Sequence, residues 1–182
     1  MKRWILAITA LSLLGSGAAR AEETVCRGRL GPITVDNLRV PEGARCVLDR
    51  TRVEGTIKVE NRAALQARRV RVIGNVQAEG ARAVQVLSRS IVGGSIQIVQ
   101  GGSAIVDFSR VVGDILYDSQ NGPLAATRND VGGNVQAFQN TGGVEISDNV
   151  IDGNLQCKEN RPRPTGGGNE VHGEKEDQCA RL

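Results

Sequence analysis

The chain has 182 residues, of which 23 are basic and 20 acidic, and only 2% of them are aromatic. This length predicts a single domain with a core of its own. The scarcity of rings fits a narrow coil and disfavours a two-layer sandwich.

The first 21 residues have the pattern of a secretory signal peptide. Lys2 and Arg3 precede an apolar run from Trp4 to Leu14, and Ala19-Arg20-Ala21 offers small residues to a signal peptidase. The run is too short to span a bilayer comfortably. We therefore predict a signal peptide at 1–21 and an exported protein, periplasmic or extracellular. A membrane anchor is the alternative, but no second apolar span follows, so no membrane span is expected after signal removal.

Removal of this segment also removes the net positive charge. Without Lys2, Arg3 and Arg20, the basic residues fall from 23 to 20 and equal the 20 acidic ones. A general role on nucleic acid or at a membrane surface therefore loses its electrostatic support. The remaining charge is uneven along the chain, because residues 22–89 carry 13 basic and 8 acidic groups while 90–182 carry 7 and 12.

The four cysteines of the mature chain indicate disulfide bonds, since an even number in an exported protein favours them. Two lie near each end, which favours the pairs Cys26–Cys46 and Cys157–Cys179 among the three possible connectivities. Each bridge would close about twenty residues, worth roughly 3 kcal/mol in the chain-entropy account. A zinc site is disfavoured because CxxC spacing is absent and His172 is the only histidine.

A repeat of 19–20 residues dominates the chain and decides the fold class. Its markers are glycines at a constant phase: Gly55, Gly74, Gly94, Gly113, Gly133, Gly153 and Gly173. A β-branched residue lies two positions before each glycine: Val53, Val72, Val92, Val111, Val131, Ile151 and Val171. An aliphatic residue lies two positions after the first six: Ile57, Val76, Ile96, Ile115, Val135 and Leu155.

Alternation with period two, β-branched residues and Gly or Asn punctuation predict short strands in each repeat. Twenty residues suffice for one turn of a parallel coil but not for a domain, so the coils must stack. We predict an all-β solenoid of about seven coils, roughly 30 Å tall at a strand spacing of about 4.8 Å. The regular repeats are expected over 53–156, with an N-terminal cap and irregular first coil at 22–52 and a loop-rich C-terminal cap at 157–182.

The repeated glycines suit a corner, which requires either a positive φ or a close approach of stacked backbones. Asparagines recur around this corner: Asn75, Asn134 and Asn154 just after the glycine, and Asn129 and Asn149 just before the apolar step. Asparagine tolerates the left-handed conformation, and stacked amides can bond from coil to coil.

The segment Asn149–Asn154 resembles the N-x-I-x-G-N step of right-handed parallel β-helix repeat proteins, the group that includes pectate-lyase-like folds. The likeness covers about 53–173 and implies a right-handed parallel β-helix, but no particular function. Left-handed hexapeptide helices are the main alternative, although their strict six-residue apolar step is absent. Bactofilins are a looser comparison, since those cytoskeletal polymers lack an export signal.

Enzymes of this fold family use clustered carboxylates, often with calcium, to cleave acidic polysaccharides. The solvent-facing acids of this chain lie at different phases, so no pair suited to hydrolysis can be assembled. They are Asp107, Asp114, Asp118, Asp130, Asp148 and Asp152. His172 is read as a capping residue. We therefore predict no catalytic residue, no metal site and no cofactor.

Two outward columns are the candidate binding residues. Three positions after the glycine stand Lys58, Gln77, Gln97, Gln136 and Gln156, interrupted by Leu116. Five positions before it stand Arg50, Arg69, Arg89 and Arg128, interrupted by Phe108 and Asp148. Such columns could contact an extended glycan or an acidic polymer, although a merely soluble outer face is the simpler interpretation.

These observations predict a non-catalytic, monomeric binding or structural module of the bacterial cell envelope, with a polysaccharide or another envelope component as partner. A minimal polysaccharide lyase or glycoside hydrolase is one alternative. A self-associating solenoid is another, since open strand edges and uneven charge favour end-to-end contact.

Overall fold

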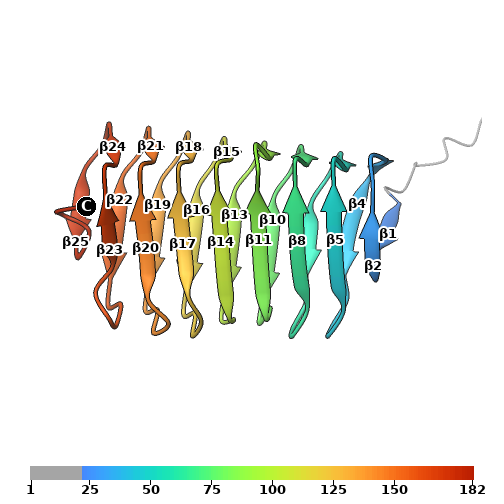
Figure 1. Cartoon of the computed structure of the whole chain (residues 1–182), viewed down its shortest axis with the longest axis horizontal. Helices are drawn as coiled ribbons and strands as arrows, with labels where there is room; N and C mark the ends of the chain where they lie inside the picture. Colours follow the sequence, from blue (N-terminus) through green and yellow to red (C-terminus); the bar gives the residue numbers. More distant parts are fainter. Residues whose placement is uncertain (1–21) are drawn as a thin grey trace, which may run out of the picture.

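The computed structural model describes residues 22–182, so the predicted signal peptide lies outside the described residues. The described chain winds into a parallel β-solenoid of stacked turns with three sheets and no helix (Figure 1). Accordingly, this part of the chain has no helix of the length and apolarity needed to cross a bilayer.

Each turn contributes one strand to each sheet. Sheet A contains β1 (Glu23–Val25), β4 (Asn37–Val40), β7 (Ile57–Val59), β10 (Val76–Glu79), β13 (Ile96–Val99), β16 (Ile115–Asp118), β19 (Val135–Phe138), β22 (Leu155–Lys158) and β25 (Lys175–Asp177). Sheet B contains β2 (Gly28–Leu30), β5 (Arg45–Asp49), β8 (Ala64–Arg68), β11 (Ala83–Leu87), β14 (Ser103–Asp107), β17 (Leu124–Thr127), β20 (Val144–Ser147) and β23 (Thr165–Gly167). Sheet C contains β3 (Thr34–Val35), β6 (Arg52–Val53), β9 (Arg71–Val72), β12 (Ile91–Val92), β15 (Arg110–Val111), β18 (Asp130–Val131), β21 (Val150–Ile151) and β24 (Glu170–Val171).

The winding is right-handed. In Figure 1 the strands of sheet B rise in front, the chain crosses through sheet C at the top, and sheet A descends behind as the stack advances from the N-terminal to the C-terminal end. All strand pairs are parallel and in register, so equivalent residues of successive repeats form straight columns, as Val76, Ile96 and Ile115 do.

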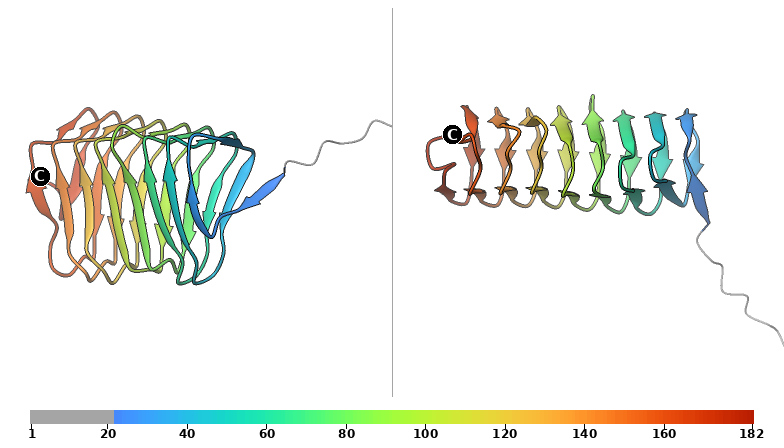
Figure 2. Two further views of the ribbon diagram at one scale, coloured as in Figure 1. Left: turned by 45° about the vertical axis from the view of Figure 1, so that its right-hand side comes forward. Right: turned by 90° about the horizontal axis from the view of Figure 1, so that it is seen from below.

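The solenoid has eight turns, one more than the glycine repeat predicted. The additional turn, β2–β3–β4, lies in segment 22–52, for which an irregular first coil was predicted. Asp36 and Asn37 occupy the place of its corner glycine, and the Asn37 side chain accepts a hydrogen bond from Thr56 N at 3.0 Å. Strands also continue into the C-terminal segment 157–182, where β23, β24 and β25 extend all three sheets (Figure 2).

The interior is a continuous stack of valine, isoleucine, leucine and alanine side chains, as predicted. Tyr117 is the exception. Its ring is fully buried and its hydroxyl donates a hydrogen bond to the carbonyl oxygen of Ala125 at 2.8 Å. A core of this composition leaves room for only one layer of side chains between the walls of each turn.

The repeated glycines lie at the corner between sheets C and A, and close backbone approach explains them. A Cβ atom at Gly74 would lie 2.7 Å from the carbonyl oxygen of Gly55 in the preceding turn. None of the repeated glycines has a positive φ, so of the two reasons considered from the sequence only close approach applies.

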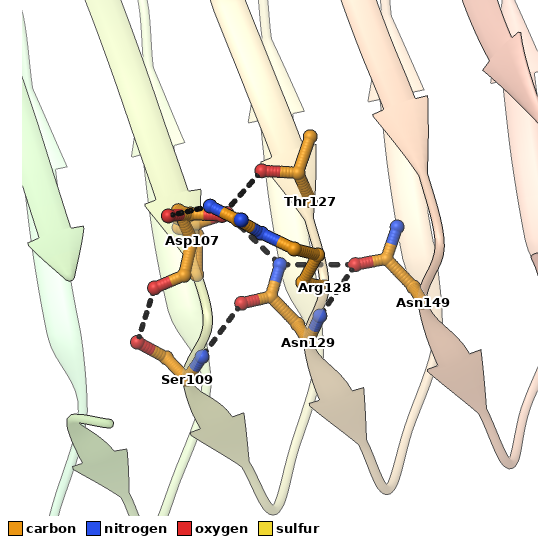
Figure 3. Close-up of polar contacts among 7 residues, drawn as sticks. Asp107, Ser109, Thr127, Arg128, Asn129 and Asn149 are labelled. Carbon is orange, nitrogen blue, oxygen red and sulfur yellow. Dashed lines mark hydrogen bonds and ion pairs between the residues drawn. The ribbon is translucent and has the colours of Figure 1, made fainter. Parts of the chain in front are cut away.

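A ladder of buried asparagines lines the turn between sheets B and C (Figure 3). The Oδ1 atom of Asn149 accepts hydrogen bonds from the backbone nitrogen of Asn129 at 2.9 Å and from its Nδ2 at 3.0 Å. Asn149 Nδ2 donates in turn to Asn169 Oδ1 at 2.9 Å and to the carbonyl oxygen of Ala126 at 2.8 Å. The predicted stacking of amides between coils is thus confirmed.

A second amide ladder, which the sequence analysis missed, lines the turn between sheets A and B. Asn140 Nδ2 donates to Asn160 Oδ1 at 2.8 Å, and Asn160 Nδ2 donates to Gln178 Oε1 at 3.1 Å. The backbone nitrogen of Gln120 donates to Asn140 Oδ1 at 2.9 Å. These contacts satisfy polar groups that burial would otherwise leave without partners.

Both predicted disulfides are present, joining Cys26 to Cys46 and Cys157 to Cys179. Each ties one end of the stack to the neighbouring turn, through Cys46 in β5 and Cys157 in β22. Disulfides of this kind persist in oxidising compartments, which agrees with export.

Candidate functional site: a groove over sheet A

The predicted arginine column is a set of turn residues. Arg50, Arg69, Arg89 and Arg128 all adopt a left-handed backbone conformation, with φ values of 59°, 54°, 63° and 56°, where the chain passes from sheet B to sheet C. This conformation costs a non-glycine residue about 1–2 kcal/mol, so the turn geometry is imposed by the stacked neighbours.

Acidic side chains of the preceding coil already bind two of these arginines. Arg69 donates to Asp49 Oδ1 at 2.7 and 3.1 Å, and its hydrogen bonds hold the pKa of the Asp49 carboxyl below its usual value. Arg128 forms a bidentate contact with Asp107 at 2.7–3.0 Å (Figure 3). Burial opposes ionisation of Asp107, yet hydrogen bonds from Arg128 and Thr127 keep its pKa below the ordinary value.

Arg50 and Arg89 complete the column. Arg50 lies 3.8 Å from Asp49, a loose ion pair. The Arg89 guanidinium stands over the ring of Phe108, 5.2 Å from its centroid. The column is therefore largely neutralised within the chain and offers a long acidic polymer few unpaired charges.

The predicted glutamine column divides into two parts. Gln136 and Gln156 are half-buried, bonded to each other at 2.7 Å and, through Gln156, to Glu176 at 3.0 Å. Gln77 and Gln97 are exposed and only weakly linked, at 3.5 Å. Only the N-terminal part of the column therefore has amides free to meet a ligand.

A groove of about 900 Å³ follows this open part of the column, and we call it the Gln groove. Its floor is the outer face of β7, β10 and β13, with Lys58, Gln77 and Gln97 in neighbouring positions of the sheet. Residues at the turn from sheet A to sheet B form the wall: Glu42, Glu60, Asn61, Glu79, Gly80 and Gln100. Leu116 lies at the C-terminal end.

The wall carboxylates make this groove more acidic than the sequence columns suggested. Glu42, Glu60 and Glu79 line it against the single ammonium group of Lys58, and Arg62 forms an ion pair with Glu42 from outside the lining. Glu60 lies 3.5 Å from Arg39 and also accepts a hydrogen bond from the backbone nitrogen of Glu42 at 3.0 Å. An acidic polymer would meet repulsion here, whereas hydroxyl groups would find both donors and acceptors.

Glu60 and Glu79 are not among the candidates predicted from the sequence, because the acidic candidates considered were aspartates near the glycines. They follow Val59 and Ala78, which pair in sheet A, so they occupy successive positions of one column. Hydrolysis needs carboxyl groups on two sides of the scissile bond. A column along one wall does not provide that arrangement.

His172 lies between two carboxylates at the C-terminal end. Its Nδ1 is 3.0 Å from Asp152 and its Nε2 is 3.3 Å from Glu170. Hydrogen bonds that the ring donates to Glu170, and then to Asp152, raise its pKa above the usual 6.5. No nucleophile or metal accompanies it: residues 22–182 contain no group of three or more His, Cys, Asp or Glu side chains that could hold a metal ion, and all four cysteines there are disulfide-bonded.

An NMR titration of the imidazole should therefore give a midpoint above 6.5, and the signal is unambiguous because the chain has one histidine. Because the pKa of His172 is higher in the folded than in the unfolded state, its contacts with the two carboxylates stabilise the fold fully below the unfolded-state pKa. This contribution is lost as the pH rises through the folded-state pKa. Glu170→Gln should lower the midpoint, while Glu174→Gln, an exposed control, should leave it unchanged. An equal midpoint in all three proteins would contradict the Glu170 contact.

The chain matches no protein-family model, no curated protein and no solved structure. The class that its fold defines is the parallel β-solenoid with disulfide-bonded ends. The likeness of Asn149–Asn154 to pectate-lyase-like repeats agrees with that fold and goes no further.

Proposed function

We propose that the mature chain is a non-catalytic, exported binding module of the bacterial cell envelope, and that it holds an uncharged glycan along the Gln groove. The observation that carries this proposal is the row of exposed polar side chains on the groove floor, Lys58, Gln77 and Gln97, beside a wall of acceptors.

The chemistry of the lining suits a chain of sugar hydroxyls. An amide offers both a donor and an acceptor, a carboxylate accepts and an ammonium donates, so each hydroxyl can find a partner in either role. Neighbouring floor residues are separated by the strand spacing of about 4.8 Å. This spacing is close to the length of one sugar ring in an extended chain, so one floor residue can serve each sugar of a chain that runs along the solenoid axis.

The same lining argues for an uncharged ligand. Glu42 and Glu60 already pair with Arg62 and Arg39, while Glu79 has no ion pair among residues 22–182. Lys58 is therefore the one basic group of the lining that could meet the many carboxylates of a polyuronate. The two disulfides support an oxidising compartment outside the cytoplasm.

The test is a binding screen of the mature chain against uncharged and acidic polysaccharides, with the Gln77→Ala/Gln97→Ala variant alongside. We expect selective binding of an uncharged glycan that weakens about tenfold or more when both amides are removed, because each lost hydrogen bond contributes on the order of 1 kcal/mol.

Two variants serve as matched controls. Gln66→Ala/Gln85→Ala removes another stacked amide pair, joined at 2.7 Å on sheet B, and should bind as well as the wild type. Arg69→Ala/Arg89→Ala tests the other column. Binding of acidic glycans alone, or loss of binding only in the arginine variant, would refute the Gln groove, and new reducing ends during incubation would show that the protein is an enzyme.

A further inference from the structure

The outer face of sheet C carries a pattern that the glycan proposal does not use. Three columns form this face, which we call the C face. They contain the left-handed residue two positions before each strand, the first residue of the strand, and the residue directly after it. The columns run Arg50, Arg69, Arg89, Phe108, Arg128, Asp148; then Arg52, Arg71, Ile91, Arg110, Asp130, Val150, Glu170; then Glu54, Ile73, Gly93, Val112, Gly132, Asp152, His172.

Large apolar side chains gather at the middle of the C face. Ile73, Ile91, Phe108, Val112 and Val150 are 36–53% exposed there. A hollow of about 300 Å³ lies beside Ile91 and Phe108. Grouped apolar side chains within a polar rim are typical of a surface that another molecule covers.

The three columns are self-complementary about a point between β12 and β15, the fourth and fifth of the eight strands of sheet C. A two-fold axis through that point, parallel to the strands and in the plane of the face, relates two copies of the chain face to face. Each column then lies against the same column of the partner in reverse order, so that β12 faces β15 and β9 faces β18. Val112 then faces Gly93, and Ile73 faces Gly132, so that two of the exposed apolar side chains meet a glycine. Ile91 faces the aliphatic stem of Arg110, and Val150 faces that of Arg52.

Charges follow the same reversal. Arg71, which has no ion pair among residues 22–182, faces Asp130, and Arg50 faces Asp148. In the first column the Arg89 guanidinium faces the Phe108 ring, as it already does within one chain. The basic N-terminal half of the face thus meets the acidic C-terminal half, which matches the uneven charge of the whole chain.

Two facing pairs have like charges, Arg69 with Arg128 and Glu54 with Asp152. Each of these two arginines is already paired in its own chain at 2.7 Å, Arg69 with Asp49 and Arg128 with Asp107. Both carboxylates already have partners in their own chain: Glu54 binds Arg52 at 2.6 Å, and Asp152 binds His172 at 3.0 Å. Their mutual repulsion is reduced by these contacts.

We propose that the C face binds a second copy of this chain in an antiparallel, isologous dimer. Isologous contact requires one patch to match itself, as the apolar, oppositely charged and cation–π pairs of these columns do. The dimer would leave the Gln groove uncovered, because sheet A forms a different side of the solenoid. It replaces the monomer expected from the sequence. A strip only eight short strands long falls near or below the usual 800 Å² or so per partner, so we expect reversible association that weakens on dilution.

The experiment compares the mass in solution of four proteins by light scattering and sedimentation over a range of concentrations. The wild-type mature chain should form dimers. Arg71→Asp and Asp130→Arg should each place like charges together and be monomeric, and the double variant should recover the dimer because the pair is restored in reverse.

Arg82→Asp is the matched control, since Arg82 is exposed but lies outside the C face, and it should dimerise as the wild type does. Val112→Arg should abolish the dimer by filling the space over Gly93, with an unchanged β-sheet spectrum. A wild type that stays monomeric at every concentration, or a double variant no more dimeric than the single ones, would overturn the proposal. Binding of the C face to anionic vesicles by a protein that stays monomeric would overturn it as well.

Discussion

Replacing Asn149 by alanine is expected to lower the free energy of unfolding by about 3–4 kcal/mol. The side chain is buried and makes four hydrogen bonds to two neighbouring coils. Its loss leaves the backbone nitrogen of Asn129 and the carbonyl oxygen of Ala126 without side-chain partners inside the turn. Urea denaturation measures the change.

The matched control is Asn121→Ala. Asn121 is exposed at a turn, so its loss should change the free energy of unfolding by no more than about 0.5 kcal/mol. Hydrogen exchange should also show that Asn149→Ala opens the last two turns more than the others, because each turn contacts only its neighbours. Equal stability of the two variants would contradict a structural role for the ladder.

The second large effect is expected from Gly74→Val. Even a Cβ atom at this corner would lie 2.7–2.9 Å from the backbone oxygen and carbon of Gly55, and backbone in a stacked sheet cannot move aside cheaply. Valine adds two methyl groups to that overlap. We expect a loss of about 3 kcal/mol, at the upper end of the usual cost of overpacking, measured by urea or thermal unfolding.

Gly31→Val provides the comparison for this substitution. No atom would lie within 4 Å of a Cβ at Gly31, and its φ is not in the left-handed region, so the variant should remain close to the wild type. If both valine variants lost equal stability, close approach of the coils would not be the reason for the repeated glycines.

The fold could be predicted from the sequence because one period governs it. Gly74, Gly94 and their equivalents mark a corner that stacking forces to be small, and Val72 and Val76 on either side are buried in sheets C and A. The first turn was predicted only as an irregular coil within 22–52, because Asn37 supports its corner through a side-chain hydrogen bond and no repeated glycine marks it. The ladder at Asn140 and Asn160 was not predicted, because it lies at the turn between sheets A and B, away from the repeated glycines that mark the other corner.

The candidate site was less predictable. The repeat shows which residues of successive coils align in a column, but it does not show which other side chains form hydrogen bonds or ion pairs with them. Arg69 and Arg128 looked free in the sequence, yet Asp49 and Asp107 lie 20 and 21 residues earlier and bind them across one coil. Glu79 ends β10 two residues after Gln77, so strand alternation alone puts both on the outer face, whereas the rest of the wall of the Gln groove depends on the conformation of the turn after sheet A. That conformation arises from stacking and has no short signature of its own.

Because the turns stack in register, the length of the solenoid is set by the number of its repeats. Because each turn meets only the turns on either side, a whole repeat inserted in the middle would find the same neighbours as those already present. Every insertion would lengthen the molecule by about 4.8 Å and leave both disulfide-bonded ends unaltered. Gene duplication could therefore adjust the reach of such a protein in fixed increments, and related chains should differ in length by multiples of one repeat.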